Sequence, residues 1–317
     1  MKIAINGFGR IGRTFYRAAS ADLNIAAVND LGNLDNLLYL LKHDTVYGLF
    51  PEKPKCKFLA EKEPEKLPWK EMGIDLVVES SGFFTKKEEA ERHLKAGAKR
   101  VLISAPSESA DITIIPGINE DQFDPEKHRI VSMGSCTTNC LVPLVAVLNK
   151  EFKIIKGYFS TIHSYTSTQG LVDKTDKKDF RRGRSAAENI IPTSTGASKA
   201  IFKIFPDLKG KIEGMAVRVP TATVSMVDFV CEVQKKTTKE LVNEAFIKAE
   251  KKSKGALVVT DEPLVSSDLK ADPHGAILDL NLTSVIDNNL VHVVAWYDNE
   301  MGYSKRLVEF CKYLSKF

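Results

Sequence analysis

Long apolar runs and a large charge imbalance are both absent from this sequence. No run of about 18 or more consecutive apolar residues occurs, so we expect no transmembrane helix. The stretch 1–7 is short and ends in glycine, which does not fit a secretory signal peptide. Lysine and arginine number 45 and aspartate and glutamate 41, which gives a net charge of only +4. We therefore expect a cytoplasmic protein with no membrane partner and with no nucleic acid as its main ligand.

Cysteine is scarce as well. The chain has five cysteines, an odd number, without the regular spacing of a disulfide scaffold. This pattern is typical of free thiols in a reducing compartment. Cys136 and Cys140 lie close together, but no neighbouring pair of cysteines or histidines completes a zinc set, so we expect no metal.

The 317 residues suffice for two domains of about 150 residues each. In the first half, short apolar segments alternate with amphipathic ones. The expected strands are 2–6, 24–29, 74–79, 100–104 and 129–132, and the expected helices are 10–20, 34–42 and 86–96. A capping box over 85–88 begins the last helix, and Gly97 ends it. The alternation predicts an α/β domain with a doubly wound parallel sheet.

The second half has a different pattern. Alternating strands are expected over 223–233, 276–286 and 290–297, with helices over 237–252 and 300–316. They predict an α+β catalytic domain with a mostly antiparallel sheet. We place the domains at 1–134 and 135–317, and expect the helix at about 300–317 to pack back on the first domain. The charged, proline-containing stretch 51–70 is expected to be a surface excursion.

A glycine-rich motif follows the first expected strand and opens a helix. It consists of Gly7, Phe8, Gly9, Arg10, Ile11 and Gly12, which fits G-x-G-x-x-G. The first glycine allows a tight turn, the second lets the backbone approach a pyrophosphate, and the third lets helix and strand pack closely. Amide groups at the helix start face the anion. Strand, glycines and helix together predict a dinucleotide site.

Asp30 ends the second expected strand, close to the distance of about 20 residues at which such folds carry an acidic residue. Its carboxylate can accept hydrogen bonds from ribose hydroxyls and repels a 2′-phosphate. We therefore expect the cofactor to be NAD rather than NADP.

Cys136 is the candidate nucleophile. It follows an expected strand and precedes the apolar run 141–148, which places it at or near a helix N-terminus. There the helix dipole and the free amides favour a thiolate, so we expect a lowered pKa for this thiol. Cys140 is one turn deeper and fits packing better than chemistry.

A thiolate nucleophile needs a base, and His163 is the candidate. It ends the expected apolar strand 157–162 and opens a polar loop. A structural or exposed histidine fits the same position equally well. Its pairing with Cys136 does not follow from their spacing.

Five stretches of the sequence together resemble one enzyme family. They are SCTTNC at 135–140, HSYT at 163–166, RRGRSAAENIIPTSTG at 181–196, RVP at 218–220 and WYDNEMGY at 296–303. In this order and length they resemble the phosphorylating glyceraldehyde-3-phosphate dehydrogenases of the bacterial and eukaryotic type. The similarity covers nearly the whole chain.

The resemblance implies the phosphorylating oxidation of D-glyceraldehyde 3-phosphate to 1,3-bisphosphoglycerate with NAD, a step of glycolysis. In that reaction Cys136 attacks the aldehyde. His163 activates the thiol and takes the hydroxyl proton as hydride leaves. The Cys136 amide and the His163 side chain help to hold the oxyanion. Inorganic phosphate then attacks the thioester and gives an acyl phosphate.

The resemblance also implies two anion subsites and further cofactor contacts. Thr166 and Arg218 would hold the phosphate of the aldehyde. The attacking phosphate would be held by Ser135, Thr137, Thr195 and Gly196, with Arg218 close enough to serve both subsites. On the cofactor side, the implied contacts are Asn299 to the nicotinamide carboxamide, Ser104 and Phe84 in the groove, and Lys62 near the adenine.

The loop over about 164–187 resembles the loop with which family members reach a neighbouring subunit. The resemblance therefore implies a homotetramer. Arg181, Arg182 and Arg184 are then subunit contacts rather than a nucleic-acid site.

The sequence departs from the family at several positions. Ser167 and Thr168 stand where Asn-Asp is usual, so an acid near the substrate phosphate is replaced by a hydroxyl. Thr175 and Asp176 replace Leu-Pro. Small polar residues at this place fit NADP users, whereas the Asp176 charge opposes a 2′-phosphate. Met-Gly at 133–134 replaces Asn-Ala.

Three alternatives stay open from the sequence. Erythrose-4-phosphate dehydrogenase is a relative, but it generally lacks a threonine at the position of Thr166. A NAD- or RNA-binding module with secondary catalysis is a different class of protein. A semialdehyde or acyl-phosphate reductase shares the cysteine chemistry but fits the matched motifs poorly.

Overall fold

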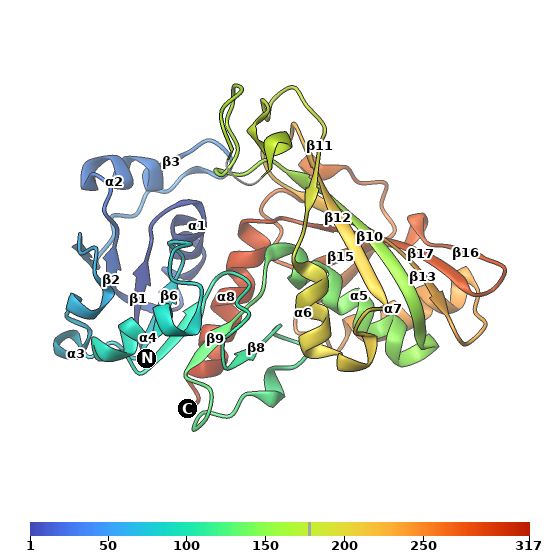
Figure 1. Ribbon diagram of the computed structural model, residues 1–317, viewed down its shortest axis with the longest axis horizontal. Coiled ribbons are helices and arrows are strands. Elements are labelled where there is room, and N and C mark those ends of the chain that lie inside the picture. The colour runs from blue at the N-terminus through green and yellow to red at the C-terminus, as the bar shows by residue number, and fades with distance from the viewer. Residues whose placement is uncertain (177–178) are drawn as a thin grey trace. The chain divides into compact units, whose positions relative to one another are not determined.

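The computed structural model describes residues 1–176 and 179–317 and separates the chain into two units. The first unit consists of Met1–Ser135 together with the C-terminal segment Ser304–Phe317, and the second consists of Cys136–Tyr303. In Figure 1 the first unit runs from blue to green and takes in the red C-terminal end of the chain.

A parallel sheet forms the centre of the first unit, as the sequence predicts. Its order is β5 (Lys57–Leu59), β2 (Asn24–Asn29), β1 (Lys2–Asn6), β6 (Leu76–Glu79), β7 (Arg100–Ile103), β9 (Ile130–Ser132) and β8 (Ile112–Thr113). Every neighbouring pair is parallel. The central strands are rich in buried valine, isoleucine, leucine and alanine, because helices cover both faces of such a sheet. The strand order reverses between β1 and β6, where doubly wound folds bind ligands.

The helices of this unit are α1 (Arg10–Ala19), α2 (Leu34–Lys42), α3 (Trp69–Met72) and α4 (Lys87–Lys95), joined by the part of α8 (Met301–Leu314) that begins at Ser304. A two-stranded ribbon, β3 (His43–Asp44) and β4 (Gly48–Leu49), follows α2. No helix in residues 1–176 or 179–317 is long and apolar enough to cross a membrane.

Two local predictions in the first unit are wrong. The stretch 51–70 is no mere surface excursion, since it holds β5 and the start of α3. Trp69 is fully buried in it and packs with Ile74 and Val77. The capping box expected over 85–88 does not form: the N-cap is Lys86, whose amide donates to the Glu89 side chain (3.1 Å) and whose own side chain cannot accept in return. Strand β8, two residues long, gave no sequence signal.

The second unit contains a mixed, mostly antiparallel sheet. Its order is β11 (Ile191–Ser194), β12 (Ile212–Val219), β10 (Ile154–Ser164), β13 (Ser225–Val233), β17 (Leu290–Tyr297), β15 (Ala276–Asp279) and β14 (Leu257–Thr260), with β16 (Ser284–Ile286) paired to β17. The pairs β10–β12 and β14–β15 are parallel and the others antiparallel.

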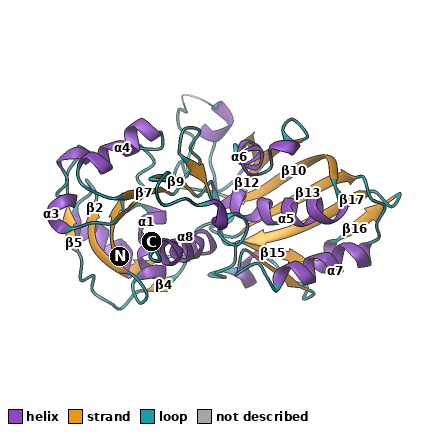
Figure 2. Ribbon diagram, turned by 90° about the horizontal axis from the view of Figure 1, so that it is seen from below, coloured by secondary structure: helices purple, strands orange, loops and turns teal. Residues whose placement is uncertain are grey.

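Helices pack on this sheet. The long helix α5 (Cys136–Phe152) lies against β10, β13, β15 and β17, as Figure 2 shows with α7 (Lys239–Glu250) beside it. Helix α6 (Ala197–Ile204) packs on α5 and β12. Along β13, alternate residues from Ser225 to Val233 are buried, which matches the alternation in the sequence.

Two boundaries in this unit differ from expectation. The strand expected over 276–286 is interrupted by a 3₁₀ turn at Leu280–Leu282, so β15 and β16 are separate. Three residues, 287–289, connect β16 and β17, since Ile286 pairs with Leu290. Asp287 and Asn288 have φ angles of 49° and 60°, and the Asn289 amide donates to the Ile286 carbonyl oxygen (3.2 Å). The expected strand 157–162 is the longer β10, so His163 lies inside a strand and does not open a loop. Strands β11, β12 and β14 and helix α6 were not expected.

Candidate active site

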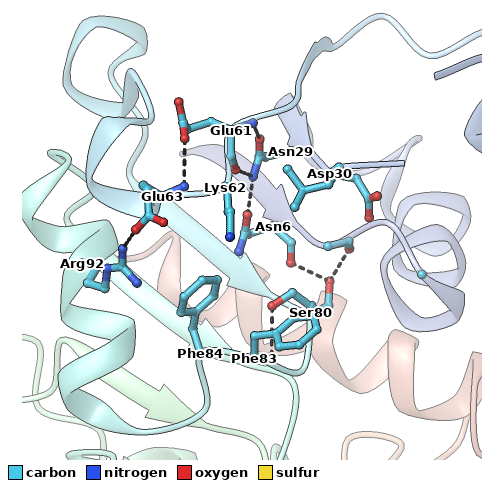
Figure 3. A pocket seen from close by; sticks show the side chains of 14 residues that line it. Asn6, Asn29, Asp30, Glu61, Lys62, Glu63, Ser80, Phe83, Phe84 and Arg92 are labelled. Carbon is cyan, nitrogen blue, oxygen red and sulfur yellow. Dashed lines mark hydrogen bonds and ion pairs between the residues drawn. The ribbon is translucent and has the colours of Figure 1, made fainter. Parts of the chain in front are cut away.

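A cavity of about 480 Å³ opens in the first unit at the carboxyl ends of β1 and β2 (Figure 3). The residues that line it are Asn6, Gly7, Gly9, Asn29, Asp30, Leu31, Glu61, Lys62, Glu63, Ser80, Ser81, Phe83, Phe84 and Arg92. Five of the residues expected to contact the cofactor are among them, namely Gly7, Gly9, Asp30, Lys62 and Phe84. The cavity therefore lies at the point of strand reversal, where the sequence placed the dinucleotide.

The three glycines of the motif differ in what surrounds them. Gly7 has a φ of +94°, and a Cβ built there would lie 2.3 Å from the Ser81 amide nitrogen. A Cβ on Gly12 would lie 2.1 Å from the Gly7 carbonyl oxygen. At Gly9 no atom lies within 4 Å of such a Cβ among the described residues. Close packing thus requires the first and third glycines, whereas the second leaves backbone accessible to a ligand.

The Asp30 carboxylate is held by two backbone amides. Phe8 N–H donates to Oδ2 (2.6 Å) and Gly32 N–H donates to Oδ1 (2.8 Å). Each oxygen keeps a second lone pair that can accept from a hydroxyl. The carboxylate therefore ties the glycine-rich loop to the end of β2 while it lines the cavity.

Other expected cofactor residues lie outside the cavity lining. Phe8 is fully buried and makes edge contacts with the rings of Tyr16 and Phe58. Arg10 forms an ion pair with Asp44 (2.5 Å). The Ser104 hydroxyl donates to the Glu79 carbonyl oxygen (3.0 Å). Ile11 and Gly12 belong to the first turn of α1.

A buried polar network that sequence reasoning missed supports the cavity wall. Asn29 Nδ2 donates to Asn6 Oδ1 (2.7 Å), and Asn6 Nδ2 donates to Glu79 Oε2 (2.6 Å), which also meets His93 Nε2 (3.0 Å). Trp69 Nε1 donates to His93 Nδ1 (3.1 Å), so His93 carries its proton on Nε2 and donates it to the carboxylate. The available signal was a polar residue ending each of β1, β2 and β6.

The second unit brings Cys136 and His163 together. Cys136 is the first residue of α5, as expected, and His163 lies on β10. Cys136 Sγ and His163 Nε2 are 3.4 Å apart. The register of β10 against β12 places Arg218 beside His163. A thiol, an imidazole and a guanidinium therefore share one site.

His163 is buried and neutral. Burial first, and then the charge of Arg218, lower its pKa to about 3. Its Nδ1 lies 2.7 Å from the Ser164 carbonyl oxygen, which also accepts from Arg218 Nη1 (2.9 Å). With the proton on Nδ1 and donated to Ser164, the lone pair of Nε2 faces the sulfur. Arg218 Nη1 lies 2.6 Å from Nδ1, and it can donate to Nδ1 only in the other tautomer, in which the proton is on Nε2.

The expected lowering of the Cys136 pKa is wrong for the chain by itself. Burial of the sulfur raises the pKa of this thiol above its ordinary value. The charge of Arg218 and hydrogen bonds from the amide and hydroxyl of Thr137 act in the opposite direction but are outweighed. The helix N-terminus does supply stabilising groups, but desolvation is the larger effect here.

A buried tyrosine sits behind this pair. Tyr297 hydroxyl hydrogen-bonds with Thr137 Oγ1 (2.9 Å) and Thr161 Oγ1 (2.8 Å), and its ring meets the His163 ring edge to face. Burial raises the pKa of Tyr297 well above its ordinary value, so it stays a neutral hydroxyl. It locks Thr137, the second residue of α5, to β10 and β17.

Hydroxyl and guanidinium groups gather near Arg218. The Thr166 and Thr168 hydroxyls are 3.0 Å apart, and Arg182 Nη2 donates to Thr168 Oγ1 (2.9 Å). The Nε atoms of Arg182 and Arg218 are buried and have no hydrogen-bond partner in the described part of the chain. The charges of the two guanidinium groups beside these hydroxyls suit an anion such as a phosphate.

Thr195 and Gly196 precede α6. Thr195 Oγ1 accepts from the Ala197 amide (3.3 Å), and Gly196 is the N-cap residue of the helix. Ser135 is half-buried and immediately precedes α5. The four residues expected around the attacking phosphate, counting Thr137, thus lie at helix starts, where free amides favour anions.

Asn299 follows β17 and is buried. Its Oδ1 accepts from the hydroxyls of Ser164 (2.8 Å) and Ser225 (3.0 Å). Neither serine was expected from the sequence, because their contact depends on the pairing of β10, β13 and β17.

The basic loop has defined partners where it is described. Arg184 pairs with Asp173 (3.0 Å), and Asp176 accepts from the Asp179 amide (2.9 Å). Residues 177–178 of the loop expected over 164–187 lie outside the described residues. In residues 1–176 and 179–317 no group of three or more histidine, cysteine, aspartate or glutamate residues is arranged to hold a metal ion.

Known proteins match this chain over both units. Residues 1–87 match the family model "Glyceraldehyde 3-phosphate dehydrogenase, NAD binding domain", and residues 135–299 match "Glyceraldehyde 3-phosphate dehydrogenase, C-terminal domain". The chain is 48% identical to glyceraldehyde-3-phosphate dehydrogenase of Geobacillus stearothermophilus, over 99% of this chain and 98% of the relative. It is 47% identical to the Streptomyces coelicolor protein of that name (98% and 97%) and 46% identical to glyceraldehyde-3-phosphate dehydrogenase 1 of Bacillus subtilis (100% and 98%).

Proposed function

The chain belongs to the glyceraldehyde-3-phosphate dehydrogenase family of NAD-dependent oxidoreductases, and from that premise we propose that it oxidises D-glyceraldehyde 3-phosphate to 1,3-bisphosphoglycerate. The reaction consumes NAD and inorganic phosphate and passes through a thioester on Cys136. The observation that carries this proposal is the Cys136 Sγ–His163 Nε2 distance of 3.4 Å beside the Arg218 guanidinium.

The chemistry begins with proton transfer from sulfur to imidazole. The Nε2 lone pair of the neutral His163 lies 3.4 Å from Cys136 Sγ and can accept the thiol proton, and because the pKa of His163 is lowered to about 3 this transfer is uphill in the free enzyme. Cys136 Sγ then attacks the aldehyde carbon, and the protonated His163 returns its proton to the oxyanion that forms. His163 takes this proton back from the hydroxyl as the hydride departs. Bound NAD supplies the hydride acceptor. Phosphate oxygen attacks the thioester carbon, and the carbon–sulfur bond breaks to regenerate the thiolate.

Two anion subsites flank this sulfur in the proposal. Thr166 and Arg218 hold the phosphate of the aldehyde, and the nearby charge of Arg182 supports an anion there. Thr168 replaces an acid with a hydroxyl, which leaves more net positive charge beside that phosphate. The attacking phosphate is held by Ser135, Thr137, Thr195 and Gly196.

The cavity of the first unit is the proposed site for part of the cofactor. Its volume and its position at the strand reversal suit the adenosine part of NAD. Gly9 offers accessible backbone to the pyrophosphate, and Asp30 accepts from the ribose and disfavours a 2′-phosphate. Phe84 and Lys62 line the adenine side, and Asn299 binds the nicotinamide carboxamide. Phe8, Arg10, Ile11, Gly12 and Ser104 shape the loop and the groove rather than line the cavity.

We further propose a cytoplasmic homotetramer. Four large apolar side chains of the segment 171–190 are exposed, namely Leu171, Val172, Phe180 and Ile190. Exposed apolar groups so close in sequence are typical of a surface that another chain covers.

An absorbance assay of NADH formation tests the proposed reaction. We expect turnover with glyceraldehyde 3-phosphate, NAD and inorganic phosphate, a much lower rate with NADP, and little with erythrose 4-phosphate. Cys136→Ser should abolish hydride transfer and leave NAD binding intact. His163→Asn should lower the rate by about 10²–10⁴-fold, the scale of a lost general base.

The assay also identifies the alternatives. A rate that does not depend on phosphate favours erythrose-4-phosphate oxidation. NAD binding without turnover by the unmodified protein, unchanged in Cys136→Ser, favours a binding module and contradicts the proposal.

A further inference from the structure

Two buried serine hydroxyls converge on one oxygen of Asn299. Ser164 Oγ donates to Asn299 Oδ1 at 2.8 Å and Ser225 Oγ donates to the same atom at 3.0 Å. The exposed fractions of Ser164, Ser225 and Asn299 are 0%, 1% and 4%. Water is therefore excluded from the two serine hydroxyls, and their protons need an acceptor within the protein.

The hydrogen bonds of Ser225 determine which way its hydroxyl proton points. The Ser164 amide donates to Ser225 Oγ (3.1 Å), so one lone pair of this oxygen is used and its own proton points elsewhere. Asn299 Oδ1 has two lone pairs and receives both hydroxyl protons. If the Asn299 amide turned over, an N–H₂ group would face two hydroxyls that have no other acceptor. Burial therefore fixes which end of the amide faces the serines.

The other end of the amide is left for a ligand. Asn299 Nδ2 has no hydrogen-bond partner among residues 1–176 and 179–317. Because Oδ1 is saturated by the serines, Asn299 can present only donors to a bound molecule. An amide free to turn would present either a donor or an acceptor.

Ser164 also contacts the base. Its carbonyl oxygen lies 2.7 Å from His163 Nδ1 and 2.9 Å from Arg218 Nη1. One residue thus holds the imidazole through its backbone and Asn299 through its side chain. Replacing the side chain with a methyl group leaves the backbone contact in place, so the two effects can be measured apart.

We propose that Ser164 and Ser225 are positioning residues that set the cofactor specificity of Asn299. They fix the amide so that Nδ2 donates to the carbonyl oxygen on the nicotinamide ring. The site then selects a cofactor whose ring substituent carries a hydrogen-bond acceptor and does not need the N–H₂ of the carboxamide. This inference rests on the proposed function, because it assigns Asn299 to that ring.

The test compares NAD with its 3-acetylpyridine analogue, which keeps the carbonyl oxygen but has a methyl group in place of N–H₂. The quantity is kcat/KM for NAD divided by kcat/KM for the analogue. In the unmodified protein a donor from Asn299 serves both molecules. In the double variant Ser164→Ala/Ser225→Ala the amide can present Oδ1, which the N–H₂ of NAD can satisfy and the acetyl group cannot. We expect the ratio to rise about twofold, because a free amide still turns Nδ2 toward the acetyl carbonyl for about half of the time.

Control variants distinguish an effect on the orientation of the Asn299 amide from a general loss of support for the strands. The single variants keep one hydroxyl on Oδ1 and should shift the ratio by less, which also covers poor folding of the double variant. Ser253→Ala removes another buried hydroxyl of the same unit, one that donates to the Glu250 and Leu257 carbonyl oxygens, and should leave the ratio unchanged.

The outcomes are distinct. A ratio that stays constant while both kcat/KM values fall shows that the serines only brace the strands, and this overturns the inference alone. Absence of NAD reduction by the unmodified protein overturns the proposed function and the inference with it.

Discussion

Arg218 acts on both members of the proposed catalytic pair through its positive charge. It counters the burial that raises the pKa of the Cys136 thiol, and after burial it is the main cause of the low pKa of His163. The first effect favours the thiolate, whereas the second keeps the imidazole neutral and opposes transfer of the thiol proton to it. One guanidinium therefore stabilises the nucleophile and weakens its base, in addition to any contact with phosphate.

This dual role predicts how Cys136 reactivity depends on pH. Replacement of Arg218 by leucine removes the charge that stabilises the thiolate, so the pKa of Cys136 should rise further. The rate of alkylation by iodoacetamide, which follows the thiolate fraction, should then reach its midpoint at a higher pH than in the unmodified protein. Peptide mass spectrometry after timed alkylation measures this rate for Cys136.

Arg218→Lys is the matched control, since it keeps the charge and should shift the midpoint less. The buried cysteines should react slowly in every variant, because burial raises the pKa of Cys140, Cys231 and Cys311. An Arg218→Leu midpoint equal to that of the unmodified protein would show that the charge does not reach the sulfur.

At the scale of elements, two glycines of the turn between β1 and α1 have different roles, one in folding and the other in cofactor binding. Gly12 packs against the Gly7 carbonyl, so Gly12→Ala should destabilise the protein by about 1–3 kcal/mol, the usual cost of overpacking. Gly9 has a φ of −69° and open space at its Cβ position, so Gly9→Ala should leave the thermal midpoint unchanged. Its methyl group meets the pyrophosphate instead, and the KM for NAD should rise about tenfold or more.

Calorimetry and steady-state kinetics on the two variants check this contrast. If Gly9→Ala lowers the thermal midpoint as Gly12→Ala does, the second glycine serves packing. If its KM for NAD stays the same, the pyrophosphate does not approach this backbone.

The elements that the sequence predicted are those with local signals. The period of two in β13, the asparagine-rich turn before β17 and the glycine after α4 depend on neighbours in the chain. Strands β8 and β12 could not be predicted in this way, since β8 has two residues and β12 has no clean alternation. The burial of Trp69 was missed because its partner His93 lies on another helix.

The site is assembled at the scale of the whole chain. Cys136 begins a helix, His163 lies on a central strand and Arg218 lies on the next strand. Strand register brings the last two together, and no spacing rule in a single sequence contains that register. Family resemblance supplied the pairing of cysteine and histidine. It supplied neither Ser164 nor the burial that raises the Cys136 pKa, because both follow from packing.

The last prediction concerns assembly. Leu171 and Val172 are 71% and 76% exposed, and a lone chain gains nothing from two such side chains on its surface. If a neighbouring subunit covers them, Leu171→Glu/Val172→Glu buries two charges in the contact and should shift the tetramer toward smaller species. Light scattering coupled to size exclusion measures the mass.

Val265→Glu, at an apolar residue of the same unit that is 58% exposed, adds a charge outside this segment and should leave the tetramer intact. An unmodified chain that elutes as a monomer, or a double variant that remains a full tetramer, would contradict the assembly through this loop. Retained NADH formation in a dissociated variant would show that each chain carries a complete site.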